Sequence, residues 1–193
     1  MNVKIAAVLT MAIILGGCAG RQVARIDPNS STDLSGRWND TDSRLVAEEM
    51  IKDSLGRVWL TDFIQAKSAK PTVIVGLVRN KSHELIGADT FIRDMEREYI
   101  NSGKVKVVQA GEAREELRDE KEDQQDNAST QTKKKWGIER GADFMLQGVI
   151  NTIVDSEGKQ KVVFYQIDLE LTNIETSEKV WLGTKKIKKL ITN

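Results

Sequence analysis

The clearest pattern in the chain is a strict alternation of side-chain types over residues 161–172. One set is wholly hydrophobic and the other is mostly polar: Val163, Tyr165, Ile167, Leu169 and Leu171 against Phe164, Gln166, Asp168 and Glu170. A period of two is typical of an antiparallel strand that is buried on one face. The flanking segments 143–154 and 179–189 are also rich in aliphatic residues. With turn residues at 156–158 and 173–178, we expect three strands joined by hairpins.

Apolar residues in the first half of the chain recur at helical spacing in three segments. They predict helices over residues 42–55, 58–66 and 89–102. Gly56 separates the first two helices, and Gly103 ends the third. The candidate N-caps of the first helix are three consecutive polar residues, Thr41, Asp42 and Ser43.

Two further strands are expected between these helices and the centre of the chain. Residues 72–79 form a nearly continuous run of aliphatic, β-branched side chains, which indicates a strand buried on both faces. A polar loop follows at 80–83, and residues 104–109 form the second strand.

The segment 112–126 holds eight acidic and three basic residues, with Ala113 and Leu117 as its only apolar candidates. This composition predicts a solvated surface helix, and an acidic docking face is the alternative. A further helix is expected over residues 130–140. Together these elements predict a single α+β domain with a mixed, mainly antiparallel sheet of about four to five strands flanked by helices.

The N-terminus carries the pattern of an export signal. Lys4 precedes an apolar run that is too short to span a bilayer, and small residues stand directly before Cys18. This pattern resembles the bacterial lipobox, which implies cleavage before Cys18 and lipid attachment to its sulfur. We expect a signal peptide at 1–17, a lipidated cysteine with a flexible tether at 18–37 and a globular domain at 38–193.

The alternative for this region is a cytosolic protein with an apolar N-terminus and a buried free cysteine. Cys18 is the only cysteine, so an intrachain disulfide is excluded, and lipidation would consume the unpaired thiol. Ala19 follows it, where inner-membrane retention favours Asp, and this favours the outer membrane. A tether of ~20 residues reaches roughly 70 Å at full extension and about 25 Å on average.

Composition and chemistry argue against several function classes. The 193 residues carry 29 basic and 29 acidic side chains, so charge gives no drive toward nucleic acid. One histidine, His83, and one cysteine cannot build a typical zinc site, and no phosphate-binding loop or nucleophile arrangement is present. We therefore expect no enzyme, no cofactor, no metal and no small-molecule substrate, although the sequence leaves a glycosidase-type carboxylate pair open.

The residues that suit contact with a partner protein are Trp38, Asp42, Arg44 and Asn80. Each also has a structural interpretation, because Trp38 can pack against the domain and Asp42 can cap a helix. Four lysines crowd the last strand, where they protect a sheet edge or meet an acidic partner: Lys185, Lys186, Lys188 and Lys189.

Several passages in order resemble one family, the LpoB-type activators of penicillin-binding proteins. They are GRWNDTDSR at 36–44, PTVIVGLVRNKS at 71–82 and GADFMLQG at 141–148, with YQIDLEL at 165–171 and VW at 180–181. The resemblance runs over about residues 36–189 and extends to the periplasmic core of CsgG-type secretion lipoproteins.

This resemblance implies a non-enzymatic outer-membrane lipoprotein that faces the periplasm. It would bind a class A penicillin-binding protein and stimulate peptidoglycan synthesis. The alternative is an accessory component of a CsgG-like envelope secretion or assembly complex. The better-known activators carry a long, proline-rich tether, whereas the expected tether here is short.

Overall fold

The computed structural model describes residues 23–28, 30–135, 137 and 139–192. The chain divides into two units, Met1–Ser30 and Ser31–Asn193, and the second contains all the described helices and strands. Cys18 and the expected signal peptide lie outside the described residues. The expected division of the chain stays a prediction.

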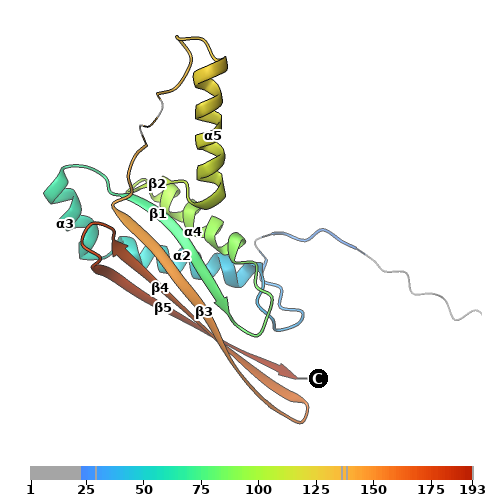
Figure 1. The fold of residues 1–193 in the computed structure, drawn as a ribbon. Coiled ribbons are helices and arrows are strands. Elements are labelled where there is room, and N and C mark those ends of the chain that lie inside the picture. Colours follow the sequence, from blue (N-terminus) through green and yellow to red (C-terminus); the bar gives the residue numbers. More distant parts are fainter. Residues whose placement is uncertain (1–22, 29, 136, 138, 193) are drawn as a thin grey trace, which may run out of the picture. The chain divides into compact units, whose positions relative to one another are not determined.

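Five strands form one mixed sheet in the order β2-β1-β3-β4-β5 (Figure 1). Their bounds are Thr72–Lys81 for β1, Lys106–Val108 for β2, Phe144–Glu157 for β3, Gln160–Asn173 for β4 and Lys179–Thr192 for β5. β1 runs parallel to both of its neighbours, whereas β3, β4 and β5 form antiparallel hairpins. The expected α+β class and mixed sheet are confirmed.

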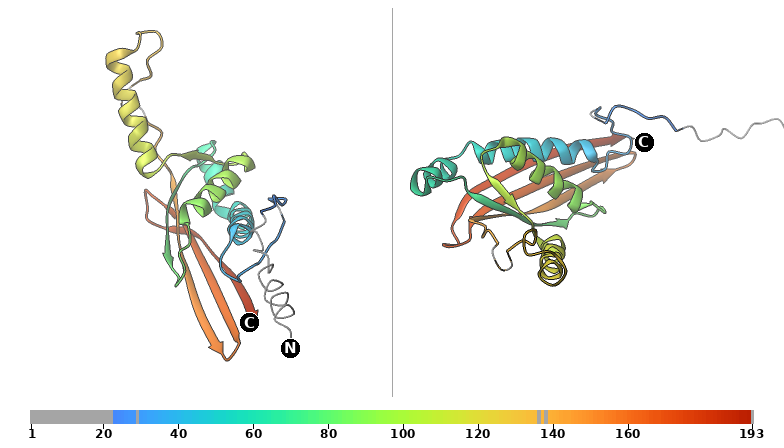
Figure 2. Two further views of the ribbon diagram at one scale, coloured as in Figure 1. Left: turned by 90° about the vertical axis from the view of Figure 1, so that its right-hand side faces the viewer. Right: turned by 90° about the horizontal axis from the view of Figure 1, so that it is seen from above.

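Two helices cover one face of this sheet, as both figures of the ribbon show (Figures 1 and 2). They are α2 (Asp40–Leu55) and α4 (Ala88–Ser102), and the shorter α3 (Val58–Lys67) follows α2 directly. Gly103 ends α4 at a φ of 63°, a left-handed conformation that glycine adopts at little cost. The helices 42–55, 58–66 and 89–102 are thus confirmed, with boundaries shifted by one or two residues.

The core lies between the covered face of the sheet and these helices. The hydrophobic set of β4 supplies its centre, since Val163, Tyr165, Ile167, Leu169 and Leu171 are all fully buried or nearly so. The residues that meet them from the helices share helical spacing: Val46, Ala47, Met50 and Ile51 on α2, and Phe91, Met95 and Tyr99 on α4. The alternation in 161–172 therefore predicted the buried face correctly.

β1 differs from the prediction in its second half. Residues Thr72–Val75 are buried, but a register shift between Val75 and Val78 leaves Leu77 68% exposed. β2 pairs only with Thr72, Val73 and Ile74, so beyond Ile74 this edge of β1 has no neighbouring strand in the described part of the chain. Burial on both faces therefore holds only for the first half of the strand. Asn80 and Lys81, expected in the loop, continue the strand.

α5 (Gly111–Asn127) has no buried residue, which confirms the expected surface helix. It projects from the end of the sheet at which β2 lies (Figures 1 and 2). None of the helices in the described part of the chain has the length and hydropathy to span a bilayer.

The helix expected over residues 130–140 is wrong. Its described residues, 130–135, 137 and 139–140, contain a turn and extended chain. Gly137 has a φ of 73°, which is incompatible with a right-handed helix. The end of α5 also holds this segment, because Gln125 Nε2 donates to the Lys134 carbonyl at 2.7 Å and Lys134 N donates to Gln124 Oε1 at 3.3 Å. Trp136 and Ile138 lie outside the described residues.

Candidate functional site

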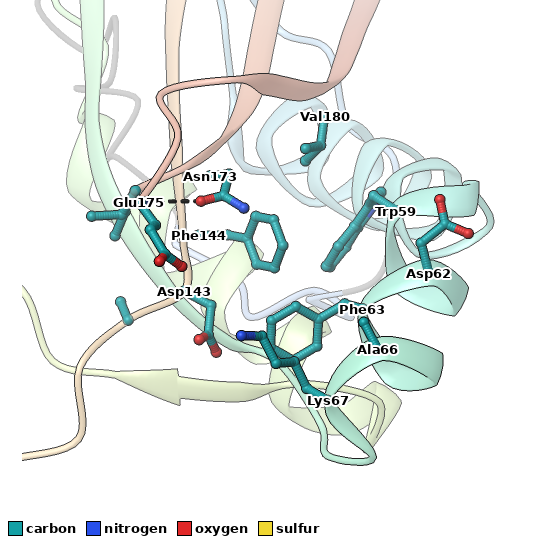
Figure 3. A pocket seen from close by; sticks show the side chains of 12 residues that line it. Trp59, Asp62, Phe63, Ala66, Lys67, Asp143, Phe144, Asn173, Glu175 and Val180 are labelled. Atoms are coloured by element: carbon teal, nitrogen blue, oxygen red, sulfur yellow. Dashed lines mark hydrogen bonds between the residues drawn. The ribbon is translucent and has the colours of Figure 1, made fainter.

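An aromatic pocket of about 460 Å³ opens between α3, the start of β3 and the turn that joins β4 to β5 (Figure 3). We call it the α3 pocket. Residues far apart in the sequence line it: Trp59, Asp62, Phe63, Ala66 and Lys67 from α3, Ala142, Asp143 and Phe144 at the start of β3, and Asn173, Ile174, Glu175 and Val180 around the turn.

Three aromatic rings form its apolar wall. The centroid of Phe144 lies 4.9 Å from that of Trp59 and 5.4 Å from that of Phe63, and both pairs meet edge to face. Trp59 and Phe144 are 4% and 3% exposed, and Trp59 Nε1 donates to the Ser54 carbonyl at 2.8 Å. Such pairs contribute about 0.5–1.5 kcal/mol each beyond their burial. The wall is therefore rigid and formed before any ligand arrives.

Charged side chains surround the aromatic wall. Asp62 and Lys67 come from α3, while Asp143 and Glu175 come from the opposite side of the pocket (Figure 3). Asp143 is held in place, because its Oδ2 accepts a hydrogen bond from Thr72 N at 2.7 Å and its N donates to Thr72 O at 2.8 Å. The side chains of Asp62, Lys67 and Glu175 have no hydrogen-bond or ion-pair partner within the described part of the chain.

Asn173 fixes the turn that closes the pocket. Its Oδ1 accepts hydrogen bonds from Glu175 N at 2.9 Å and from Thr176 N at 3.2 Å, which leaves the side-chain amide donor for other contacts. Among the described residues, no serine, histidine, cysteine or tyrosine lines the pocket. An arrangement of aromatic faces, carboxylates and one amide is suited to holding a side chain of a partner.

Two of the four residues predicted from the sequence, Trp38 and Asn80, lie in a different place, around Glu84 in the loop after β1. Trp38 N donates to Glu84 Oε2 at 3.0 Å, Tyr165 OH donates to Glu84 Oε1 at 2.8 Å, and Asn80 Nδ2 donates to the Glu84 carbonyl at 2.8 Å. Burial first, and then the bond to the Glu84 carboxylate, raise the pKa of Tyr165. The Trp38 ring packs between Phe91 and Tyr165, with centroids at 6.2 and 5.6 Å.

Asp42 begins α2 in a capping box with Asn39, rather than as the N-cap itself. Asn39 Oδ1 accepts from Asp42 N, and Asp42 Oδ2 accepts from Asn39 N. Asp42 Oδ2 also accepts a 2.6 Å hydrogen bond from Lys189 Nζ, which donates in addition to Asp33 Oδ1 at 2.7 Å and to Arg37 O at 3.1 Å. We call these residues the Lys189 cluster.

Electrostatics favour the charged form of this cluster. Burial alone would lower the pKa of Lys189, but hydrogen bonds and charges from Asp33 and Asp42 outweigh it and raise the pKa. The bond to Lys189 holds the pKa of Asp33 below its usual range. Among the four lysines predicted to protect the edge strand, Lys189 thus joins the segment before α2 to β5. Lys185 pairs with Glu49 on α2.

The structure thus brings Trp38, Asp42 and Asn80 close to one another and gives each an internal role. Arg44 stands apart on the surface of α2, where its Nη1 lies 3.2 Å from Glu48 Oε1. Whether these four residues contact a partner stays a prediction, as does lipidation of Cys18.

His83 lies in an exposed loop, and its Nδ1 is 2.7 Å from Thr152 Oγ1. Within the described residues, no group of His, Cys, Asp and Glu side chains is arranged to hold a metal ion.

A family model described as "Peptidoglycan-synthase activator LpoB" matches residues 42–187 of this sequence, which is most of the chain. The chain belongs to the LpoB family. The whole lining of the α3 pocket, from Trp59 to Val180, falls within the matched region, whereas Trp38 and Lys189 fall outside it.

Solved structures of the LpoB family are among those similar to this chain. The C-terminal domain of LpoB from Escherichia coli is 17% identical over 77% of this chain and 99% of that chain, with a TM-score of 0.44. The NMR structure of E. coli LpoB is 14% identical over 92% and 82%, with a TM-score of 0.43. Lipoprotein GNA1162 from Neisseria meningitidis is 13% identical over 62% and 83%, with a TM-score of 0.40. No curated protein sequence matches the chain.

Reasoning from the sequence missed the α3 pocket of this LpoB-family chain. Trp59 and Phe63 both lie on the helix expected over residues 58–66, and neither is among the predicted site residues. The i, i+4 spacing of two aromatic residues on a helix that also carries Asp62 and Lys67 was the available signal. Phe144 and Glu175 join them only through the tertiary fold, so no local pattern indicates the pocket.

Proposed function

We propose that this protein is an outer-membrane lipoprotein that binds a class A penicillin-binding protein in the periplasm and activates it. The observation that carries the proposal is the match of residues 42–187 to the peptidoglycan-synthase activator family. The lipobox before Cys18 supports a lipid anchor, and Ala19 in place of Asp supports the outer membrane. The protein acts by contact and is not itself an enzyme.

The tether limits where this contact takes place. The expected tether at 18–37 is about 20 residues long, so it reaches roughly 70 Å at full extension and about 25 Å on average. We therefore expect the synthase to present its docking surface close to the inner leaflet of the outer membrane.

The test uses the full-length lipidated protein in detergent with a purified class A penicillin-binding protein from the same organism. We expect saturable binding and a faster rate of glycan-strand polymerisation. Crosslinking in the native envelope tests the alternative partner. Recovery of a secretion channel without any peptidoglycan synthase, together with no rate increase in the purified system, would overturn the proposal.

A further inference from the structure

We propose that the α3 pocket receives an arginine side chain of the partner protein, a step that rests on the proposed function for the identity of that partner. The half-buried ring of Phe63, which is backed by the buried rings of Trp59 and Phe144, would stack on the guanidinium group, and the carboxylates would accept its hydrogen bonds. The pocket would then be the anchor point of the interface.

Charge is the first argument. Three carboxylates line the pocket, on Asp62, Asp143 and Glu175, against a single ammonium group on Lys67. The lining therefore carries an excess of two negative charges. The carboxylates of Asp62 and Glu175 have no partner in the described part of the chain, and an apolar plug would remove them from water without compensation. A cation satisfies them, whereas an acidic side chain is repelled.

The shape and lining of the pocket distinguish arginine from other cations. A guanidinium group is planar, stacks on aromatic faces and donates to carboxylates in two parallel bonds, whereas lysine presents a strongly hydrated point charge. The cavity of about 460 Å³ has ample room for an arginine side chain and the backbone that carries it.

Rigidity of the walls is the third argument. Trp59 is fixed by its bond to the Ser54 carbonyl, and α3 is joined to α2 by the Arg57–Asp53 ion pair. On the opposite side, the two hydrogen bonds between Asp143 and Thr72 hold the start of β3 against β1. A pocket that is already formed loses little conformational entropy when an anchor residue enters, which favours tight binding.

The first experiment is site-specific photocrosslinking in the native envelope. A photoreactive p-benzoylphenylalanine replaces Ala66 in the α3 pocket, and a matched variant carries it at Leu182 on the uncovered face of the sheet. We expect the position-66 probe to capture the synthase within a few residues of an arginine. Capture from position 182 alone would overturn the pocket assignment while leaving the proposed function intact. Capture of the synthase from neither position, with no binding in the purified system, would remove the proposed function as well.

The second experiment measures affinity for the synthase with the full-length protein in detergent. Glu175→Gln and Asp62→Asn each remove one charge and keep the side-chain shape, and Phe63→Leu removes an aromatic face. We expect each to weaken binding about fivefold to thirtyfold, as central anchor contacts do. The control is Glu157→Gln, which removes one exposed charge at the β3–β4 turn.

The decisive variant lies on the partner. The crosslinked arginine is replaced by lysine, and we expect the affinity loss to approach that of its replacement by methionine, because stacking and paired hydrogen bonds need the guanidinium group. Unchanged affinity for Glu175→Gln, Asp62→Asn and Phe63→Leu would reject the anchor role, whatever the strength of the wild-type interaction.

Discussion

Single side chains fasten the segment before α2 to the domain. Lys189 and Asp42 are only about a tenth exposed at the side chain, with values of 11% and 10%, and Lys189 also bonds Asp33 and the Arg37 carbonyl. Because Asp42 is at the same time part of the capping box of α2, the Lys189 cluster couples the start of the first helix to the edge strand β5.

We expect Lys189→Met to lower the free energy of unfolding by about 2–3 kcal/mol, because it leaves the buried carboxylate of Asp42 without its cation. Urea denaturation followed by tryptophan fluorescence measures this. Lys188→Met is the matched control, since Lys188 is exposed on the neighbouring position of the same strand. Equal unfolding midpoints for the two variants would contradict a stabilising role of the cluster.

The contribution of the Lys189 cluster to the free energy of unfolding should fall at both high and low pH. The pKa of Lys189 is raised, so its contribution is present below pH 10.5 and is lost as the pH rises through the folded-state pKa. The pKa of Asp33 is lowered from 3.8, so its smaller contribution is present above that value and is lost as the pH falls further. We expect the stability difference between wild type and Lys189→Met to be largest at neutral pH and to shrink toward pH 3 and pH 11. A difference that is constant over this range would contradict the electrostatic explanation.

Two residues illustrate what could be predicted at this scale. The packing of Trp38 against the domain could be predicted from residue type and position alone, whereas the N-cap of α2 is Asn39 rather than Thr41, Asp42 or Ser43. The partner of Asp42, Lys189, lies 147 positions later in the sequence, and a pair so distant has no local signature. The same limit applies to the carboxylate of Glu84, which accepts from Trp38 N, 46 positions earlier, and from Tyr165 OH, 81 positions later.

Among the elements, α5 contributes least to the packed core. It has no buried residue, and its ion pairs are local or link it to the segment that returns to β3, as Arg118 does with Glu115 and Glu139. Exposed ion pairs of this kind add little stability. α4, by contrast, buries Phe91, Met95 and Tyr99 against the sheet.

A proline placed in each helix should separate these roles. We expect Glu116→Pro in α5 to lower the free energy of unfolding of the domain by less than about 1 kcal/mol. Glu98→Pro in α4 should lower it by at least about 3 kcal/mol. Tryptophan fluorescence reports the core, and far-ultraviolet circular dichroism reports the helix lost. If both variants destabilise the core equally, α5 is part of the cooperative unit.

The helices and strands that could be predicted are those whose pattern of hydrophobic and polar residues matches their burial in the fold. The alternation in β4 follows directly from one covered and one open face, and the acidic composition of α5 follows from its exposure. The expected helix at 130–140 failed because Gly137 and contacts from Gln124 and Gln125 override a weak local propensity. The exposed second half of β1 could not be foreseen, because the apolar run continues through Leu77 and Val78 without a change in pattern.

For the whole molecule, the proposed attachment to a membrane rests on Cys18. We expect Cys18→Ser to release the protein from the membrane fraction into the soluble fraction of the envelope while its folded domain keeps the wild-type unfolding midpoint. Fractionation followed by immunoblotting measures the first, and urea denaturation the second. A Cys18→Ser protein that still sediments with membranes would contradict lipid attachment at this residue.

The family could be recognised from short passages in the right order, and the fold class from the order of helices and strands. The α3 pocket could not, because Trp59, Phe144 and Val180 are brought together by three separate parts of the chain.

This dispersal has a consequence for folding kinetics. The β3–β4 and β4–β5 hairpins join residues near in sequence, whereas the parallel pairing of Val73 with Phe144 closes a loop of about 70 residues. Long-range pairing of this kind is slow relative to local contacts. We therefore expect Phe144 to reach Trp59 in one of the late folding steps, so that the pocket forms only as folding is completed. A newly exported or truncated chain would be unable to bind a synthase through the α3 pocket. Binding through this pocket would therefore require a fully folded domain.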